Sequence, residues 1–273
     1  MRGTCIAFFF SGRDAKNRSS VGAVDIDIAN RKVIREHCNP FFEYGPEGSF
    51  YADGVSIGNC YEVNGIRYIL FMGWQSPKDG HWRGDVGRLI LKPDLTLELA
   101  SEAPIMSSDL VDPISLSYPW VTKEAKGGYS MWYGSTATWD AGNGEMLHVI
   151  NYASSMDGHH WNREGLAVPY ELGRAQAFSR PTVAGNSETG FGMWFSYRSG
   201  SGEKYRIGYA SSKNGKNWQL ALEEAGIDVS PDGWDSEMIE YPFAFDHEGQ
   251  QYILYNGNDY GKTGFGLAVL IDE

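Results

Sequence analysis

Three carboxylates stand beside predicted strands, in positions where general acid–base chemistry is feasible. Asp53 comes directly before an apolar strand, Glu240 comes one residue before Tyr241, and Asp112 lies on a connection. Cleavage of a glycosidic bond typically uses two carboxyl groups, one that protonates the leaving oxygen and one that activates water or attacks carbon. The acid needs a raised pKa, which burial or a like-charged neighbour supplies. Asp53, Glu240 and Asp112 are therefore our candidate catalytic residues.

Each carboxylate also has a purely structural explanation. Asp53 is followed by Gly54 and could cap a turn. Glu240 could form a salt bridge to a neighbouring repeat of the chain. Asp112 precedes Pro113 and could belong to a simple turn. The sequence alone leaves both interpretations of each residue open.

Arginines give a second kind of candidate. Arg180 occupies a predicted strand directly before Pro181, where small or apolar residues are usual. A buried arginine must be paired, either with a carboxylate of the protein or with an anionic ligand. Arg13, which follows the first aromatic strand, and Arg174 could point to the same place. The three predict a sugar that bears a carboxylate or phosphate, unless they form salt bridges between repeats.

Aromatic, amide and acidic side chains near the same strands complete the candidate binding site. Aromatic rings can stack on a sugar face, although each of them could instead belong to the core. Amides after the last aromatic strand can hydrogen-bond to hydroxyl groups, whereas a loop glutamate could simply be solvated. The further candidate substrate-binding residues are Trp74, Tyr118, Tyr133, Glu237, Tyr241, Asn256, Asn258 and Tyr260.

A repeated aromatic strand sets the fold that must position these residues. Similar segments begin at Tyr68, Tyr129, Phe191 and Tyr252, so successive starts are 61, 62 and 61 residues apart. A further step of 62 residues toward the N-terminus reaches Ile6, which opens a fifth aromatic segment. A period of this kind indicates a repeat architecture.

Each repeat has companion strands. A shorter strand, often containing proline, precedes the aromatic one, and a third strand with small residues follows it. Asp157-Gly158 and Asn214-Gly215 then supply hairpin turns, because Gly and Asn reach the positive φ that such turns require. Four antiparallel strands per repeat, arranged radially, are typical of a propeller blade.

We therefore predict an all-β fold, a five-bladed β-propeller that comprises residues 1–273 as a single domain. A two-sheet sandwich is the alternative, but it gives no reason for the equal spacing. The first repeat has too few residues for an inner strand, and the last ends after its third strand. A short first blade, or a strand shared between the two ends, would close the ring. The only helix predicted lies in 220–226.

Composition excludes several classes of partner. The 273-residue chain has a net charge of −12, which argues against binding to nucleic-acid phosphates. No stretch approaches the length needed to span a membrane. Three cysteines without metal-ligand spacing favour reduced thiols and a cytoplasmic location. Gly261-Lys262-Thr263 lacks the remaining glycine of a phosphate loop, so we expect no nucleotide cofactor. The histidines show no metal-ligand spacing, so we expect no metal and no other cofactor. We expect a small carbohydrate as the partner.

Longer strings then show a family resemblance. The segments MWFSYRSG (193–200), YRIGYASSKNGKNW (205–218) and YNGNDYGKTGFGLAVL (255–270) resemble the five-bladed propeller glycosidases and their relatives. That group contains arabinanases, xylosidases, invertases and mannoside phosphorylases. The resemblance implies a funnel at one end of the propeller axis where a sugar ring binds. It also implies an inner-strand aspartate as base or nucleophile, a second aspartate that tunes a pKa, and a glutamate as general acid.

The family pattern is only partly present. Asp53 is similar to the inner-strand aspartate, and Asp112-Pro113 resembles the end of an Arg-Asp-Pro motif in which Val111 replaces the arginine. The next inner strand has no carboxylate where the family has its acid, and Glu240 or Glu237 could supply one from the last blade.

Our leading hypothesis is a glycoside hydrolase-like enzyme that acts on a small, possibly anionic sugar by carboxylate general acid–base catalysis in the central funnel. One alternative is a carbohydrate-binding propeller without catalysis. Another is a biosynthetic tailoring enzyme of different chemistry that reuses the funnel, since fold alone does not decide function.

Overall fold

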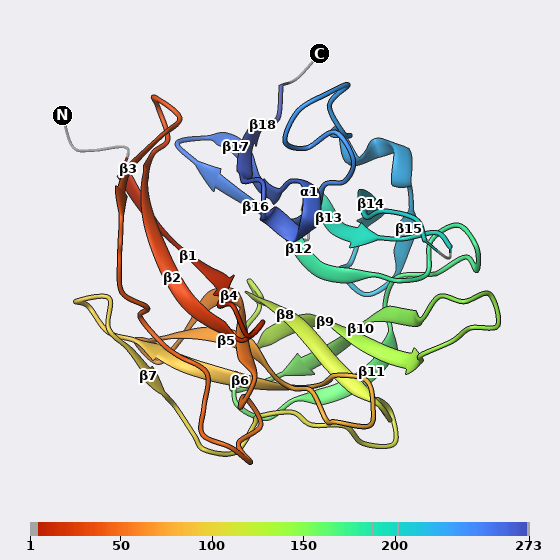
Figure 1. Cartoon of the computed structure of the whole chain (residues 1–273), viewed down its shortest axis with the longest axis horizontal. Helices are drawn as coiled ribbons and strands as arrows, with labels where there is room; N and C mark the ends of the chain where they lie inside the picture. Colours follow the sequence, from red (N-terminus) through yellow and green to blue (C-terminus); the bar gives the residue numbers. More distant parts are fainter. Residues whose placement is uncertain (1–4, 187, 201, 272–273) are drawn as a thin grey trace.

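The computed structural model describes residues 5–186, 188–200 and 202–271, and it is built almost entirely of β-strands. The strands form five blades that follow one another around a common centre (Figure 1). The predicted five-bladed β-propeller is therefore confirmed. The aromatic segments predicted from the repeat lie in the long strands of the successive blades.

The first two blades share one hydrogen-bonded sheet, because a single parallel pair joins Ser19 to Gly54. Blade I consists of β1 (Cys5–Arg13), β2 (Ser19–Asp27) and β3 (Lys32–Glu36). Blade II consists of β4 (Gly54–Val63), β5 (Ile66–Gln75), β6 (Arg83–Leu91) and β7 (Leu97–Leu99).

The other three blades are separate sheets. Blade III consists of β8 (Ser115–Lys123), β9 (Tyr129–Thr138), β10 (Leu147–Ser155) and β11 (Asn162–Leu166). Blade IV consists of β12 (Ser179–Asn186), β13 (Gly190–Tyr197), β14 (Arg206–Ser212) and β15 (Trp218–Leu220). Blade V consists of β16 (Glu240–His247), β17 (Gln250–Asn256) and β18 (Phe265–Val269). The short helices are the 3₁₀ helix η1 (Leu222–Ala225), within the predicted helical segment, and α1 (Asn258–Gly261).

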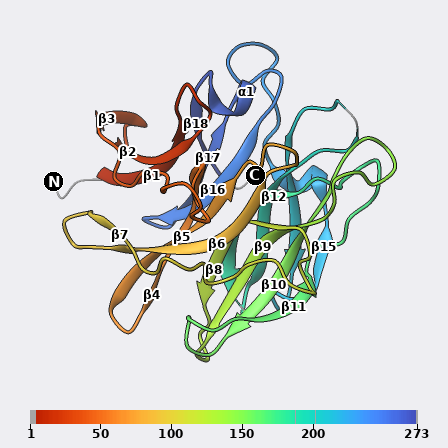
Figure 2. The same cartoon turned by 60° about the horizontal axis from the view of Figure 1, so that its bottom comes forward.

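The core consists of apolar layers between neighbouring blades. Five buried clusters are present, one for each pair of adjacent blades. Alternate residues of β5 explain how one strand serves two layers, because successive side chains of a strand point to opposite faces. Tyr68 and Leu70 pack toward blade III, and Ile69 and Phe71 pack toward blade I. The tilted view in Figure 2 shows blades III and IV side by side.

In the part of the chain that the structure describes, blade I has no inner strand, and this shows how the ring closes. The Oγ of Ser11 in β1 accepts a hydrogen bond from the Ile57 N–H of β4, and the Oγ of Ser196 in β13 accepts one from the Tyr241 N–H of β16. β1 thus occupies the position of a second strand. Within the described residues the two ends share no strand. Phe8 instead packs against Phe245, with ring centroids 5.1 Å apart, so side chains join blades I and V.

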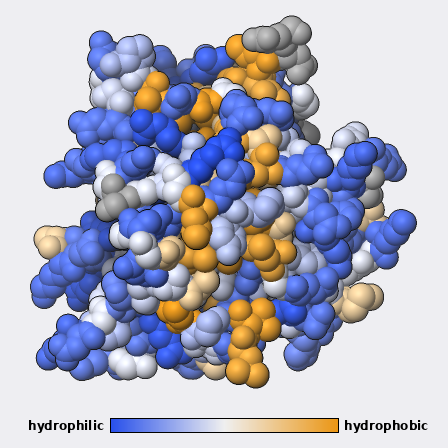
Figure 3. All heavy atoms as spheres, turned by 90° about the vertical axis from the view of Figure 1, so that its right-hand side faces the viewer, coloured by the Kyte–Doolittle hydropathy of each residue, from blue (hydrophilic) through white to orange (hydrophobic). Residues whose placement is uncertain are grey.

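Polar residues cover much of one face of the molecule. Seen from the side of blades III and IV, hydrophilic residues predominate and apolar ones are interspersed among them (Figure 3). In the described part of the chain, no helix has both the length and the apolar character that crossing a membrane requires. The three cysteines are exposed and unpaired.

The inner strands β4, β8, β12 and β16 approach one another closely at the axis. A Cβ atom added to Gly58 of β4 would lie 2.2 Å from the carbonyl oxygen of Pro119 in β8. Backbone atoms of the neighbouring blade cannot move aside as a flexible side chain can. Glycine is therefore required at this point of contact between blades II and III.

We predict that Gly58→Ala destabilises the fold by about 1–3 kcal/mol, because overpacking a rigid site displaces backbone. Gly80→Ala is the matched control, since a Cβ there has no atom within 4 Å. Urea denaturation of both variants measures the change. Equal stabilities of the two would contradict the close approach of the inner strands.

Candidate active site

Three inner strands contain the same backbone distortion at the same place. Tyr118, Arg180 and Tyr241 have φ values of +40°, +48° and +55°, and each is followed by a proline. The register of β8, β12 and β16 shifts at these residues. A bulge of this kind re-aims a side chain, and left-handed backbone in a non-glycine residue costs about 1–3 kcal/mol. Strain in three consecutive blades points to a functional role for the three side chains.

The three side chains form a stack. The Arg180 guanidinium lies over the Tyr118 ring at 5.1 Å and the Tyr241 ring at 5.4 Å, and the Tyr118 hydroxyl donates to the Tyr241 hydroxyl at 3.4 Å. Cation–π contacts of this kind hold a guanidinium without neutralising its charge. No carboxylate lies within 4 Å of Arg180 among the residues described. This half-buried cation is thus left without an anionic partner in the described part of the chain.

Glu240 lies beside this stack and is fully buried. Neither of its carboxyl oxygens has a hydrogen-bond partner within the described protein. Burial raises the pKa of Glu240 to about 8, although the positive charges of Arg180, Arg13 and Arg198 act in the opposite direction. A buried carboxyl group without any partner is rare in native proteins and calls for an explanation such as a ligand or a catalytic role.

Other polar atoms at this place are also unpaired. The Nε of Arg180, the Nε of Arg198 and the Oγ of Ser179 are buried without hydrogen-bond partners within the described residues. A small cavity next to the stack is lined by Gly58, Pro119, Trp120, Pro181, Pro242 and Phe243 together with Tyr118 and Arg180. Unpaired polar groups of blades IV and V therefore gather at this place. We call Tyr118, Arg180, Glu240 and Tyr241 the axial cluster.

Arg13 and Arg198 approach Glu240 from the two blades on either side of blade V. Each arginine comes two residues after the serine that bonds to the next inner strand, Ser11 in blade I and Ser196 in blade IV. Arg198 also binds Glu145, with 2.8 Å between Nη2 and Oε1. The two positions are equivalent in the repeat, and the positive charges of Arg13, Arg198 and Arg180 all act on the Glu240 carboxyl group without forming an ion pair with it among the described residues.

Arg198 and Tyr205 were missed in the sequence. The Arg198 guanidinium lies over the Tyr205 ring, 4.7 Å from its centroid. Burial raises the pKa of Tyr205, and the nearby charge of Glu240 raises it further. A usable signal existed for Arg198, since it stands at the same place in its repeat as Arg13. Nothing comparable distinguishes Tyr205, because it lies on a connection outside the repeated strands.

The segment that leads into Glu240 is braced on both sides. The Oδ1 of Asn258 accepts hydrogen bonds from the Glu237 and Met238 N–H groups. The carbonyl of Tyr205 accepts the Ile239 N–H at 3.3 Å. Asn258 is thus nearly buried and supports the backbone, which corrects its prediction as a residue that binds substrate directly.

Asp112 and Tyr133 are not at the axis, contrary to the prediction. Asp112 is fully buried among the middle and outer strands of blade III, where it accepts hydrogen bonds from the Tyr133 hydroxyl, the Asn151 amide and the Arg163 guanidinium. Its carboxylate is therefore satisfied by the protein. Tyr133 is likewise fully buried and cannot stack on a sugar.

Arg174 and Trp74 also need correction. Arg174 is exposed and pairs with Glu171 and Glu223, so it forms a surface ion pair. Trp74 is only 7% exposed, its Nε1 donates to the Ser19 Oγ, and the Arg13 guanidinium lies 5.3 Å from the ring centroid. The Arg13 guanidinium therefore covers the Trp74 ring, which is not accessible to a sugar.

The remaining candidates lie around the rim. Asp53 is half-buried at the start of β4, and its Oδ2 accepts the Ser76 N–H at 2.6 Å. Glu237 is exposed and pairs with Lys204. Asn256 lies opposite Glu240 in the β16–β17 register, and the ring of exposed Tyr260 is 6.2 Å from that of Tyr205. Asn256 and Tyr260 are thus close to the axial cluster.

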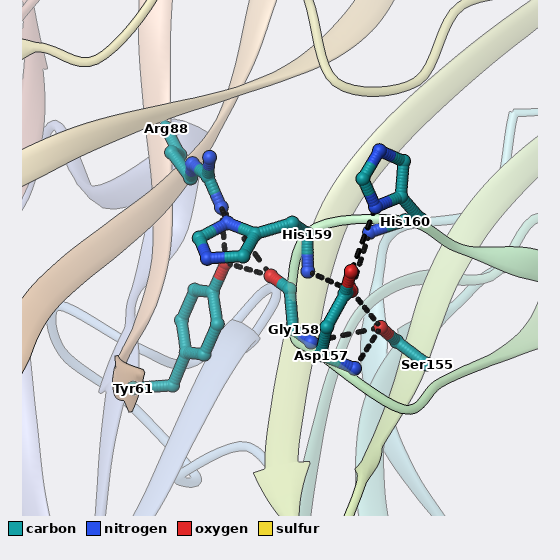
Figure 4. A network of polar contacts seen from close by, with 7 residues as sticks. All are labelled: Tyr61, Arg88, Ser155, Asp157, Gly158, His159 and His160. Carbon is teal, nitrogen blue, oxygen red and sulfur yellow. Dashed lines mark hydrogen bonds and ion pairs between the residues drawn. The ribbon is translucent and has the colours of Figure 1, made fainter. Parts of the chain in front are cut away.

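A second polar network lies at the opposite end of blade III (Figure 4). There Arg88 donates to the Gly158 carbonyl and lies 2.6 Å from the Nδ1 of His159, which must then be unprotonated, and Asp157 pairs with His160. These contacts join the hairpin turn of blade III to blade II. The hydrogen bonds of this network all go to protein groups, and only the Nε of Arg88 is buried without a partner among the described residues, so we assign the network a structural role. Among the described residues, no three metal-binding side chains converge.

The axial cluster can supply a proton and hold an anion. Glu240 can donate a proton from its neutral form and is then stabilised as an anion by three guanidinium groups. Arg180 offers its charge to a ligand because no protein carboxylate neutralises it. One carboxyl group and three arginines are thus assembled where the five blades meet.

Comparison with known proteins now places the chain. No protein-family model matches its sequence. Two sequence relatives are Uncharacterized protein MT1551 and Uncharacterized protein Rv1502 of Mycobacterium tuberculosis, from strains CDC 1551 and H37Rv. Each is 42% identical over 272 residues, which cover 99% of this chain and 89% of the relative. The chain belongs to the same family as these two proteins.

Solved structures extend the comparison to the fold. A glycoside hydrolase superposes with a TM-score of 0.74 at 12% identity, covering 98% of this chain and 84% of that one. The sucrose-6-phosphate hydrolase of Lactobacillus gasseri gives 0.67 at 14% identity, over 97% and 55%. A structure from the GH130 family of mannoside phosphorylases, which contains glycoside hydrolases that target β-1,2-mannosidic linkages, gives 0.57 at 16%, over 85% and 74%. The protein shares the fold of the five-bladed propeller glycosidases, as the sequence resemblance implied.

We predict that Glu240→Gln stabilises the protein at high pH. The pKa of Glu240 rises from 4.5 to about 8 on folding, so its contribution to stability is complete below pH 4.5 and is lost as pH rises through 8. Glutamine has no such loss. The variant should gain stability relative to wild type from pH 5 to pH 8, by on the order of 3–5 kcal/mol.

Denaturation at pH 5 and pH 8 measures this gain. Glu237→Gln, on the exposed side of the same segment, is the control and should change little at either pH. A stability difference between Glu240→Gln and wild type that does not depend on pH would contradict the burial of an unpaired carboxyl group.

Proposed function

We propose that the protein cleaves the glycosidic bond of a small sugar or sugar conjugate that carries an anionic group. Glu240 acts as the general acid, and Arg180, Arg13 and Arg198 bind the anionic group. The observation that carries this proposal is the fully buried Glu240 carboxyl group, which has no hydrogen-bond partner in the described protein and faces three arginines.

The protonation state of Glu240 suits this role. With a pKa of about 8 the carboxyl group is mostly protonated at neutral pH. It can therefore transfer its proton to the oxygen of the leaving group as the bond from that oxygen to the anomeric carbon breaks. The carboxylate that remains is stabilised by Arg180, Arg13 and Arg198, which favour its charged form.

The arginines favour an anionic substrate. Arg180 is held between two tyrosine rings and has no carboxylate partner among the described residues, so its charge is available to a ligand. Guanidinium groups bind carboxylates and phosphates through paired hydrogen bonds. The structurally similar sucrose-6-phosphate hydrolase is named for a phosphorylated sugar, which is consistent with this class of substrate.

The second participant distinguishes two reactions. In hydrolysis, Asp53 at the rim would activate water. In phosphorolysis, inorganic phosphate held by the arginines would attack the anomeric carbon, and the C–O bond to phosphate would replace the glycosidic bond. The positions of β4, β8 and β12 that match Glu240 hold Ile57, Ser117 and Ser179, and none is a carboxylate. This observation favours phosphorolysis as the second candidate. The GH130 neighbour does not decide between the two reactions, because its family of mannoside phosphorylases also contains glycoside hydrolases.

We predict that Glu240→Gln lowers the turnover of aryl glycosides, sialosides or sugar phosphates at least about 100-fold, since general acid catalysis contributes that much or more. Product release is followed by mass spectrometry with and without inorganic phosphate. Loss of turnover in both Glu240→Gln and Asp53→Asn indicates hydrolysis. Phosphate-dependent turnover that survives Asp53→Asn indicates phosphorolysis. Absence of turnover by wild type on every substrate would refute catalysis and leave a binding role.

We further predict that kcat declines on the alkaline side near pH 8. Glu240 must carry a proton to act as an acid, and its pKa of about 8 sets the pH at which half of the protein has lost it. A pH–rate profile on the best substrate measures this limb. An activity that is still rising at pH 9 would show that another group supplies the proton.

A further inference from the structure

A cluster of aromatic side chains lies on two connections outside the axial cluster. His81 and Trp82 belong to the β5–β6 connection, and Trp139 begins the β9–β10 connection. The His81 and Trp139 rings are stacked with centroids 4.4 Å apart, and Trp82 meets Trp139 edge-on at 5.0 Å. We call these three residues the rim platform.

The rim platform is not part of the hydrophobic core. None of its members belongs to the five interblade clusters, His81 is exposed, and both tryptophans are only half-buried. Neither indole N–H has a hydrogen-bond partner within the described residues, although hydrogen bonds are recorded for Trp74, Trp132, Trp194 and Trp218. Single exposed apolar residues are normal on a protein surface, whereas a group of large aromatic side chains often marks a binding site. The rim platform is such a group.

The rim platform lies at the same end of the propeller as the axial cluster. Trp74, at the end of β5, pairs with Gly54 at the start of β4, and Thr136, near the end of β9, pairs with Ser115 at the start of β8. Glu240 similarly stands at the start of β16. Both connections therefore leave the blades on the face where the inner strands begin.

A rigid polar contact links the platform to the axis. The Trp82 ring is 5.9 Å from that of His148, and the Nε2 of His148 is 2.7 Å from the Oγ of Ser117. Ser117 directly precedes Tyr118 of the axial cluster. Burial lowers the pKa of His148 to about 4, so this contact is uncharged at neutral pH. The platform is therefore built onto the inner strand of blade III, on which Tyr118 lies.

We propose that the rim platform binds a second, neutral sugar unit of the substrate, beyond the anionic unit held at the axial cluster. Aromatic faces attract the C–H face of a sugar ring, and free indole N–H groups and His81 can bond to its hydroxyls. The charged side chains next to the platform in the described chain have partners within the protein. Arg83 pairs with Asp85, and Asp140 accepts a hydrogen bond from the Gly142 N–H of its own turn. The proposal rests on the proposed function for the identity of the substrate as a glycan.

The test measures binding of neutral oligosaccharides of glucose, mannose, galactose and xylose, with their monosaccharides as references. Quenching of tryptophan fluorescence and calorimetry report affinity. We expect one oligosaccharide to bind wild type more tightly than its monosaccharide, and Trp139→Ala to weaken that binding about five- to tenfold. Trp139→Phe, which keeps a ring, should weaken it less. Tyr170→Ala, which removes an exposed tyrosine on another connection, is the control and should leave it unchanged.

Inorganic phosphate, titrated into the same variants, reports the axial cluster separately. Oligosaccharide binding that depends on Trp139 supports the platform even if phosphate fails to bind, in which case only the proposed function fails. Equal oligosaccharide affinity in wild type and folded Trp139→Ala overturns the platform, as does absence of binding to all oligosaccharides. Trp139-dependent binding of nucleoside monophosphates in place of sugars also overturns it.

Discussion

Close packing of the inner strands around one axis is the constraint on which the site depends. At this axis the backbone of β4 approaches that of β8 so closely that Gly58 has no room for a side chain. In β8, β12 and β16 the register breaks, and a left-handed residue before a proline redirects its side chain. Crowding and strain thus place Tyr118, Arg180 and Tyr241 in one stack, where packing alone would favour small residues.

The same crowding explains the chemistry of Glu240. Removal of its carboxyl group from water penalises the charged form more than three nearby arginines favour it, so the pKa rises. The arginines are not in direct contact with Glu240 among the described ion pairs, so attraction does not cancel the effect of burial. An acid that is neutral at pH 7 and becomes an anion beside guanidinium groups is suited to donate a proton. The same burial lowers the free energy of unfolding at high pH, where Glu240 must ionise inside the protein.

The sequence predicted the fold well because its signal is a period. An aromatic strand every 61 or 62 residues indicates a repeated blade, even though the first and last blades have fewer strands than the others. It also indicated Arg180, Glu240 and Tyr241, since each stands at a proline in an inner strand. Tyr133 could not be placed, because the alternation of side chains along β9 decides which of them are buried. Asp112 could not be placed, because its partners Tyr133, Asn151 and Arg163 come from three different strands. Arg198 was overlooked although it repeats the position of Arg13.

The most direct measurement of the central claim is the ionisation of Glu240 itself. Carbon-13 NMR of protein labelled at glutamate side-chain carboxyls, recorded from pH 4 to pH 10, follows each group, and the signal lost in Glu240→Gln identifies this one. We expect it to titrate near pH 8 and to shift on addition of a sugar phosphate. A Glu240 carboxyl that titrates near 4.5 and is unaffected by anions would contradict the account.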